Sequence, residues 1–203
     1  MASWSYDTRI NRYRDDKTKR FLSAKTVVGY RDAIVDKATT RVAELAKAVS
    51  DGTITPSDFA AELRKVTKDV YATQYSLGRG GVNALTRSDI GNLGNMLREQ
   101  YEYIDRFQRD LQSGLVSGEA AIANRAGLYV ESGLAAYEEG NASARGMVLP
   151  PESPPVHPAC RCSFRWAVES GKHVAYWVVR DGPCPQCAAL ASQYQPWEGK
   201  VAA

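Results

Sequence analysis

All four cysteines of this 203-residue chain lie in two short segments near its C-terminal end. The first segment is HPACRC at 157–162, and the second is PCPQC at 183–187. Between them, residues 163–169 and 173–179 are rich in aromatic and branched side chains and predict two β-strands joined by SGK. In an antiparallel hairpin the start of the first strand lies beside the end of the second. We therefore expect the two cysteine pairs to meet at the open end of the hairpin.

Four thiolates that arrive as two close pairs suit a tetrahedral zinc ion. The expected ligands are Cys160, Cys162, Cys184 and Cys187, and His157 is an alternative ligand in a set with three of the cysteines. A two-stranded hairpin in so short a lobe has little core of its own. Structural zinc, whose apparent binding free energy in small peptides is about 10–16 kcal/mol, would supply what is missing. Reduced or disulfide-paired cysteines in a small hydrophobic lobe remain the other interpretation.

The start of the chain, MASWSYDTRINRYRDD, is polar and charged and lacks the apolar stretch of a secretory signal. No apolar run approaches the roughly 18 residues of a membrane span, so no membrane partner is expected. We therefore expect a protein that stays in the cytosol where it is made. Cytosolic thiols are kept reduced, which favours metal binding or catalysis over a disulfide framework.

The region before the cysteines is dominated by apolar residues at helical spacing. They predict about four amphipathic helices, which begin near Lys25, Pro56, Thr86 and Ser117. Thr55 is expected to cap the second helix, with Asp58 in the capping-box position. The fourth helix is rich in alanine and glycine, which allows another helix to approach closely. The predicted fold is mainly α with a small β appendage: a helical bundle or helical hairpins, followed by a zinc-ribbon-like β-hairpin lobe.

Composition divides the chain into four regions. Five of the nine prolines fall in LPPESPPVHP, which predicts a semi-rigid linker. Residues 1–20 carry six basic and three acidic side chains with interleaved aromatic residues. This pattern predicts an arm that packs on its own domain, on a partner or on DNA phosphates. The expected regions are the basic, aromatic arm at 1–24, the helical domain at 25–146, the linker at 147–158 and the Cys-rich lobe at 159–203.

No arrangement in the sequence predicts an enzyme or a small-molecule substrate. PCPQC matches half of the zinc deaminase signature, but His157 is followed by proline and alanine in place of the required glutamate, and we expect no helix at the second cysteine pair. Neighbouring acids such as Glu138 and Glu139 read as solvated surface. No nucleotide-binding glycine loop or nucleophile-elbow motif is present.

HPACRCSFRW resembles the His-Pro-x-Cys-Arg-Cys signature of the minor head, or head morphogenesis, proteins of tailed bacteriophages. The preceding RAGLYVESGLAAYEEGNASA is similar to the Arg-x-x-x-Tyr helix of these proteins, and the helical region from DGTITPSDF to GRGG also resembles them. By this resemblance His157, Cys160 and Cys162 are the signature residues, and Cys184 and Cys187 form the second knuckle. In many of these proteins the second element precedes the first, whereas here DGPCPQC follows it.

The resemblance implies a structural virion component and no enzymatic activity. Such a protein would be made in the host cytoplasm and would then lie in the capsid interior or at the portal vertex. Its partners would be the portal or the major capsid protein, with packaged DNA contacted through the N-terminal arm, and its roles would be head assembly and DNA ejection. The alternative function is a small zinc-dependent nucleic-acid-binding protein, in which the lobe and the arm would both lie on DNA.

Overall fold

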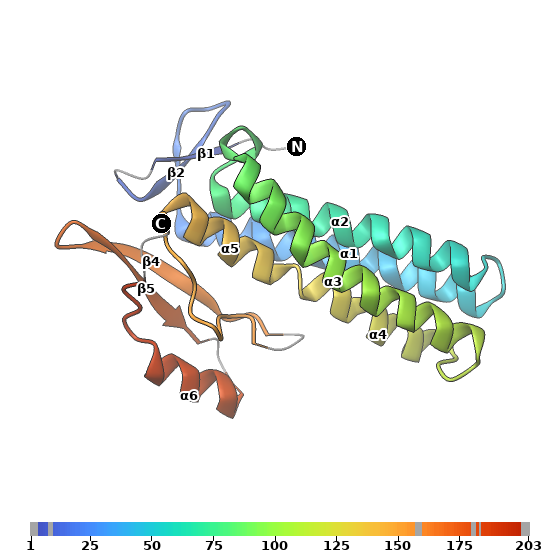
Figure 1. Cartoon of the computed structure of the whole chain (residues 1–203). Helices are drawn as coiled ribbons and strands as arrows, with labels where there is room; N and C mark the ends of the chain where they lie inside the picture. Colours follow the sequence, from blue (N-terminus) through green and yellow to red (C-terminus); the bar gives the residue numbers. More distant parts are fainter. Residues whose placement is uncertain (1–3, 8–9, 157–159, 180–181, 183, 200–203) are drawn as a thin grey trace.

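The structure is a computed structural model that describes residues 4–7, 10–156, 160–179, 182 and 184–199. An elongated helical bundle forms most of the molecule, and two small β-sheets lie near one end of it (Figure 1). The bundle helices are α1 (Ala24–Ser50), α2 (Pro56–Arg79), α3 (Arg87–Gln112), α4 (Glu119–Glu131) and α5 (Leu134–Ala144), with the short 3-10 helix η1 (Val82–Ala84) before α3. The expected fold class, mainly α with a small β appendage, is confirmed.

The starts of the long helices follow the capping residues in the sequence. Thr55 caps α2 with its side chain, which accepts a hydrogen bond from the Asp58 N–H at 3.1 Å, and Asp58 completes the capping box. Thr86 and Asp89 form the same arrangement at α3. Each box satisfies two backbone donors that a helix start otherwise leaves unpaired. These local signals explain why the sequence places both helix starts correctly.

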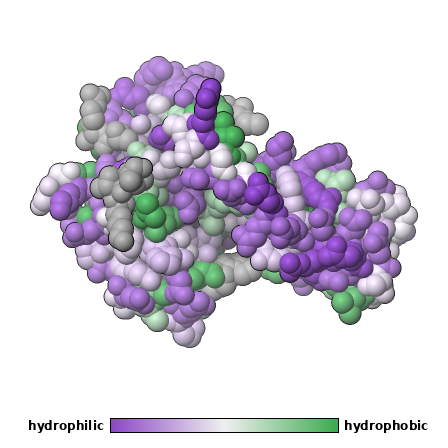
Figure 2. All heavy atoms as spheres, in the orientation of Figure 1, coloured by the Kyte–Doolittle hydropathy of each residue, from purple (hydrophilic) through white to green (hydrophobic). Residues whose placement is uncertain are grey.

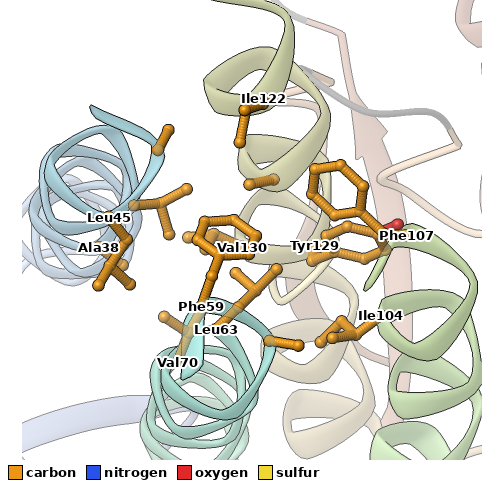
Figure 3. Packing of buried hydrophobic residues seen from close by; sticks show 14 of the residues in the cluster. Ala38, Leu45, Phe59, Leu63, Val70, Ile104, Phe107, Ile122, Tyr129 and Val130 are labelled. Carbon is orange, nitrogen blue, oxygen red and sulfur yellow. The ribbon is translucent and has the colours of Figure 1, made fainter. Parts of the chain in front are cut away.

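The main core joins α1, α2, α3 and α4 (Figure 3). Phe59 of α2 and Phe107 of α3 meet edge to face with their ring centroids 5.7 Å apart, and both rings are fully buried. Ala38 and Leu45 approach from α1, and Val130 approaches from α4. On the face seen in Figure 2, hydrophilic side chains predominate and hydrophobic ones form small separate areas. None of the described helices combines the length and hydropathy needed to cross a bilayer.

The segment expected as one fourth helix is two helices, α4 and α5, separated at Ser132 and Gly133. A Cβ at Gly133 would lie 2.5 Å from Cγ1 of Val70 on α2, so the break is in close contact with α2. The two helices have different neighbours: α4 packs chiefly on α1, and α5 packs chiefly on α2. Apolar periodicity alone did not reveal this, because both helices keep apolar and small residues at helical spacing.

Helices α2 and α5 approach so closely that their backbones touch through glycines. A Cβ added at Gly78 would lie 2.0 Å from the carbonyl oxygen of Tyr137, and one at Gly140 would lie 2.2 Å from that of Tyr75. The sequence-based expectation of a close approach by the alanine- and glycine-rich segment is therefore confirmed. Its tightest points are these two reciprocal glycines.

The substitution Gly140→Ala should lower the free energy of unfolding by about 1–3 kcal/mol, because the new methyl group meets backbone atoms that move only if the helices separate. Chemical denaturation followed by far-ultraviolet circular dichroism measures the change. The control is Gly94→Ala in α3, where an added Cβ meets nothing within 4 Å, and it should stabilise the protein by up to about 1 kcal/mol. Equal effects of the two substitutions would contradict the close contact.

The N-terminal residues form a three-stranded antiparallel sheet of β1 (Trp4–Asp7), β2 (Arg12–Asp15) and β3 (Phe21–Leu22), in that order. The sheet packs on its own helices. The buried hydroxyl of Tyr13 donates to Oδ1 of Asn141 on α5 at 2.6 Å, and its ring joins a small cluster with Val27, Leu77 and Tyr137. Of the three placements left open for the arm, packing on its own domain is the one observed for the described residues.

The C-terminal lobe contains the expected hairpin, β4 (Ser163–Glu169) and β5 (Lys172–Val178), paired from Ser163–Val178 to Glu169–Lys172. Ser170 and Gly171 make the two-residue turn, and both have positive φ, as a tight hairpin turn requires. The helix α6 (Pro185–Gln193) follows the hairpin. Ala175 and Trp197 then exchange two backbone hydrogen bonds of 2.9 Å, which add a bridge beside β5.

The proline-rich segment is packed where the structure describes it. Met147 and Leu149 are buried in the same cluster as the hairpin residue Trp177. The indole Nε1 of Trp197 donates to the carbonyl oxygen of Val148 at 3.0 Å. The start of the expected linker therefore contributes to the core of the lobe.

Candidate metal centre

Three buried cysteine sulfurs meet at the open end of the hairpin. The Sγ atoms of Cys160, Cys162 and Cys187 all lie within 4.8 Å of one another, and those of Cys160 and Cys187 are 3.5 Å apart. Four sulfurs around a tetrahedral zinc ion at 2.3 Å would be about 3.8 Å apart. The 3.5 Å between the sulfurs of Cys160 and Cys187 is well beyond the roughly 2.05 Å of a disulfide bond. The cluster has the spacing of a metal site.

The second cysteine pair is positioned by the start of α6. Cys184 is the N-cap residue, and its Sγ accepts a hydrogen bond from the N–H of Cys187 at 3.3 Å. The expectation that no helix accompanies this pair is wrong: a proline at the first helical position begins a helix directly after Cys184. The partial positive charge at a helix N-terminus favours thiolates, so α6 supports metal binding by both residues.

The electrostatics of the cluster favour a bound cation. Burial and the neighbouring sulfurs of Cys184 and Cys160 raise the pKa of the Cys187 thiol well above its usual value. For Cys160, burial opposes ionisation, but hydrogen bonds from the backbone of Cys162 and Val156 hold the thiol pKa below its usual value. Sulfurs this close cannot all ionise without a compensating charge, and a metal ion supplies it. The cluster could therefore hold a metal ion through Cys160, Cys162 and Cys187, with Cys184 beside them.

The first cysteine pair is held against the helical bundle. Nη2 of Arg31, a fully buried α1 residue, donates to the carbonyl oxygen of Arg161 at 3.4 Å. The side chain of Arg161 in turn forms an ion pair with Asp36 of α1, with 3.3 Å between Nη2 and Oδ1. Because Arg161 lies between Cys160 and Cys162, these contacts fix the first knuckle relative to the bundle.

Sequence reasoning missed Glu138, which was expected to be solvated surface but is only 1% exposed. Its Oε1 accepts a hydrogen bond from the N–H of Phe164 at 3.3 Å and lies 3.9 Å from Nη1 of Arg31. Burial raises the pKa of Glu138 to about 7, although the positive charge of Arg31 opposes the shift. The signal in the sequence is its position one helical turn after Leu134 and one turn before Ala142, which places it on the buried face of α5.

His157, the alternative ligand, lies outside the described residues. The four predicted cysteine ligands are described, and the structure brings their two pairs together at one end of the hairpin. No protein-family model, no curated protein and no solved structure matches this chain. The cysteine cluster, which could hold a metal ion, is accordingly the candidate functional site.

Proposed function

We propose that the chain is a structural component of a tailed-bacteriophage head, a minor head protein whose C-terminal lobe is stabilised by zinc. The observation that carries the proposal is that the cysteine pair within the HPACRC motif lies beside Cys187 of the second pair. Thiolate-rich sites with tetrahedral spacing favour zinc over magnesium or calcium, which prefer oxygen ligands. The zinc would be structural, since four thiolates would leave no open position for a water molecule or a substrate.

The shape of the bundle and its contacts with the lobe support a structural role. The helices form an elongated body, and the lobe is attached at one end of it (Figure 1). Buried polar contacts from Arg31 and Glu138 hold the lobe in one orientation. A rigid two-part body of this kind suits a protein that joins other proteins in an assembly. We propose the portal or the major capsid protein as the partner, first in the host cytoplasm and then in the virion.

We expect the purified, reduced protein to contain about one zinc ion per chain, because the two knuckles together form one closed site. Elemental analysis after extensive dialysis measures the stoichiometry. A Cys160→Ser, Cys162→Ser double variant should lose the metal. A wild-type preparation without zinc, or a double variant that retains zinc in full, would contradict the metal assignment.

The virion assignment needs a separate test. Gradient-purified heads from cells producing the phage that encodes this chain should contain it, and an affinity-tagged copy should retain the portal or the major capsid protein. Heads that lack the protein would contradict the structural role, whatever the zinc content. Conversely, heads that contain a zinc-free protein would contradict only the zinc assignment.

A further inference from the structure

A cleft of about 550 Å³ opens where the N-terminal sheet, the bundle and the hairpin meet. Its walls come from the β2 region, the first turns of α1, the last turns of α5 and the strand β4. These segments are far apart in sequence, yet Oδ1 and Nδ2 of Asn11 join them by contacting Arg145 of α5 and Trp166 of β4. The volume lies within the usual range for small-ligand sites.

The residues lining the cleft include four cations and no carboxylate. The cations are Arg12, Lys25, Arg145 and Arg165. Within the described part of the chain, no acidic side chain forms an ion pair with any of the four within 4.0 Å. Elsewhere, by contrast, exposed cations such as Arg41, Lys47 and Lys65 are paired with acids on their own helices. The cleft is therefore a place where positive charge gathers without compensation.

Arg145 is held in place by neutral groups. Its Nη1 donates to Oδ1 of Asn141 at 3.0 Å and its Nη2 donates to Oδ1 of Asn11, also at 3.0 Å. The guanidinium lies over the rings of Tyr6 and Trp166, 4.3 Å and 4.7 Å from their centroids. The charge of Arg145 lowers the pKa of Glu138, although the two groups are too far apart to form an ion pair. No carboxylate in the described residues forms an ion pair with Arg145. With its N–H groups bonded to asparagines and its faces covered by rings, Arg145 contributes a fixed positive charge beside the cleft.

Two of the other cations line the cleft from different elements. Lys25 of α1 and Arg165 of β4 are both exposed and line the cleft, and the guanidinium of Arg165 lies 4.5 Å from the centroid of the Tyr176 ring. Lys25 lies in the first turn of α1, which contains no acidic residue and whose partial positive charge adds to that of the side chains. Apolar and aromatic surface from Val27, Tyr137 and Phe164 completes the walls. A ligand with both negative charge and a less polar portion would match these surroundings.

We propose that this cleft binds the phosphate groups of a nucleoside phosphate or of a DNA strand. Arginine-rich sites recognise phosphate through paired N–H donors, and the apolar walls can accept the sugar or the base. This inference goes beyond the head-protein role and does not depend on it. A chain that is absent from virions could still bind phosphates here, and a virion protein could leave the cleft empty.

The test uses the full-length protein and fluorescence anisotropy with a labelled oligothymidylate, and unlabelled ADP serves as competitor. The double variant Lys25→Ala, Arg165→Ala should weaken binding of the oligonucleotide about tenfold and reduce the slope of log K against log salt by about one to two. The matched control, Lys37→Ala with Lys68→Ala, removes the same charge from exposed positions on α1 and α2 and should leave both quantities nearly unchanged. Thermal melts check that every variant is folded.

Competition by ADP would identify a free nucleoside phosphate as a ligand of the cleft. Oligonucleotide binding that depends on Lys25 and Arg165 but resists ADP would identify phosphates of the strand. Absence of binding to both probes would overturn the proposal, as would equal weakening in the cleft variant and its control. Displacement of the oligonucleotide by oligoglutamate as readily as by ADP would also overturn it, since the cleft would then take an acidic peptide.

Discussion

The substitution Cys187→Ser is expected to unfold the C-terminal lobe while most of the helical bundle stays folded. Cys187 is 1% exposed, and its sulfur lies 3.5 Å from that of Cys160. Serine is a poor zinc ligand, so the variant should lose the contribution of the metal, which in small peptides is about 10–16 kcal/mol. The lobe core, built around Phe164 and Trp177, is too small to replace a contribution of that size.

The bundle should survive because its core is separate. The buried residues of the main cluster come from α1 to α5, and none comes from the lobe. The two parts are nevertheless joined by the contacts of Arg31 and Glu138 with the backbone of Arg161 and Phe164. Loss of the lobe would leave these two buried charged groups without those partners. We therefore expect a folded bundle with a lower thermal midpoint than in the wild type.

Tryptophan fluorescence and far-ultraviolet circular dichroism separate the two outcomes. Trp177 is 2% exposed within the lobe, so its emission should shift to longer wavelength in Cys187→Ser while the helical signal is largely retained. Ala189→Ser, at an exposed position on α6, introduces the same hydroxyl and should change neither signal. Simultaneous loss of both signals in Cys187→Ser would show that the chain unfolds as one unit. An unchanged emission would show that the lobe needs no metal.

The elements that could be predicted are those whose signals are local. Capping residues and apolar periodicity located α1, α2 and α3, and the dense β-branched and aromatic runs located β4 and β5. The tight turn at Ser170 and Gly171 then fixes the register, which brings the cysteine pairs together. The candidate site was predictable because a hairpin with short flanks leaves little freedom for the positions of its four cysteines.

The elements that could not be predicted depend on contacts between distant segments. The strands β1 and β2 are short and charged. Tyr13 of β2 can be buried because its hydroxyl donates hydrogen bonds to Asn141 of α5 and to the carbonyl oxygen of Gly78 of α2. The burial of Glu138 likewise depends on Arg31 and on β4, which lie on either side of it in space and far from it in sequence. From sequence alone, charged residues are expected at the surface, because an ion pair between buried side chains leaves no periodic pattern in the sequence.

Glu138 should also make the stability of the protein depend on pH. In the folded state its pKa is raised from 4.5 to about 7 by burial, against the opposing charges of Arg31 and Arg145. Below pH 4.5 both the folded and the unfolded states carry the proton. Between pH 4.5 and pH 7 only the folded state keeps it, so the free energy of unfolding falls as the pH rises. One pKa unit corresponds to 1.36 kcal/mol, so the full loss is about 3 kcal/mol and is complete above pH 7.

The substitution Glu138→Gln should remove this pH dependence, because the amide oxygen can still accept the hydrogen bond from Phe164 but the group does not ionise. Denaturation at several pH values should show that wild-type stability falls relative to that of Glu138→Gln by about 3 kcal/mol between pH 4.5 and pH 7.5. Subtracting the two curves cancels the titration of groups that they share. Glu102→Gln, which removes an exposed carboxyl from α3, should reproduce the wild-type curve. A wild-type curve parallel to that of Glu138→Gln would mean that water reaches the carboxylate, and that the lobe does not seal this side of α5.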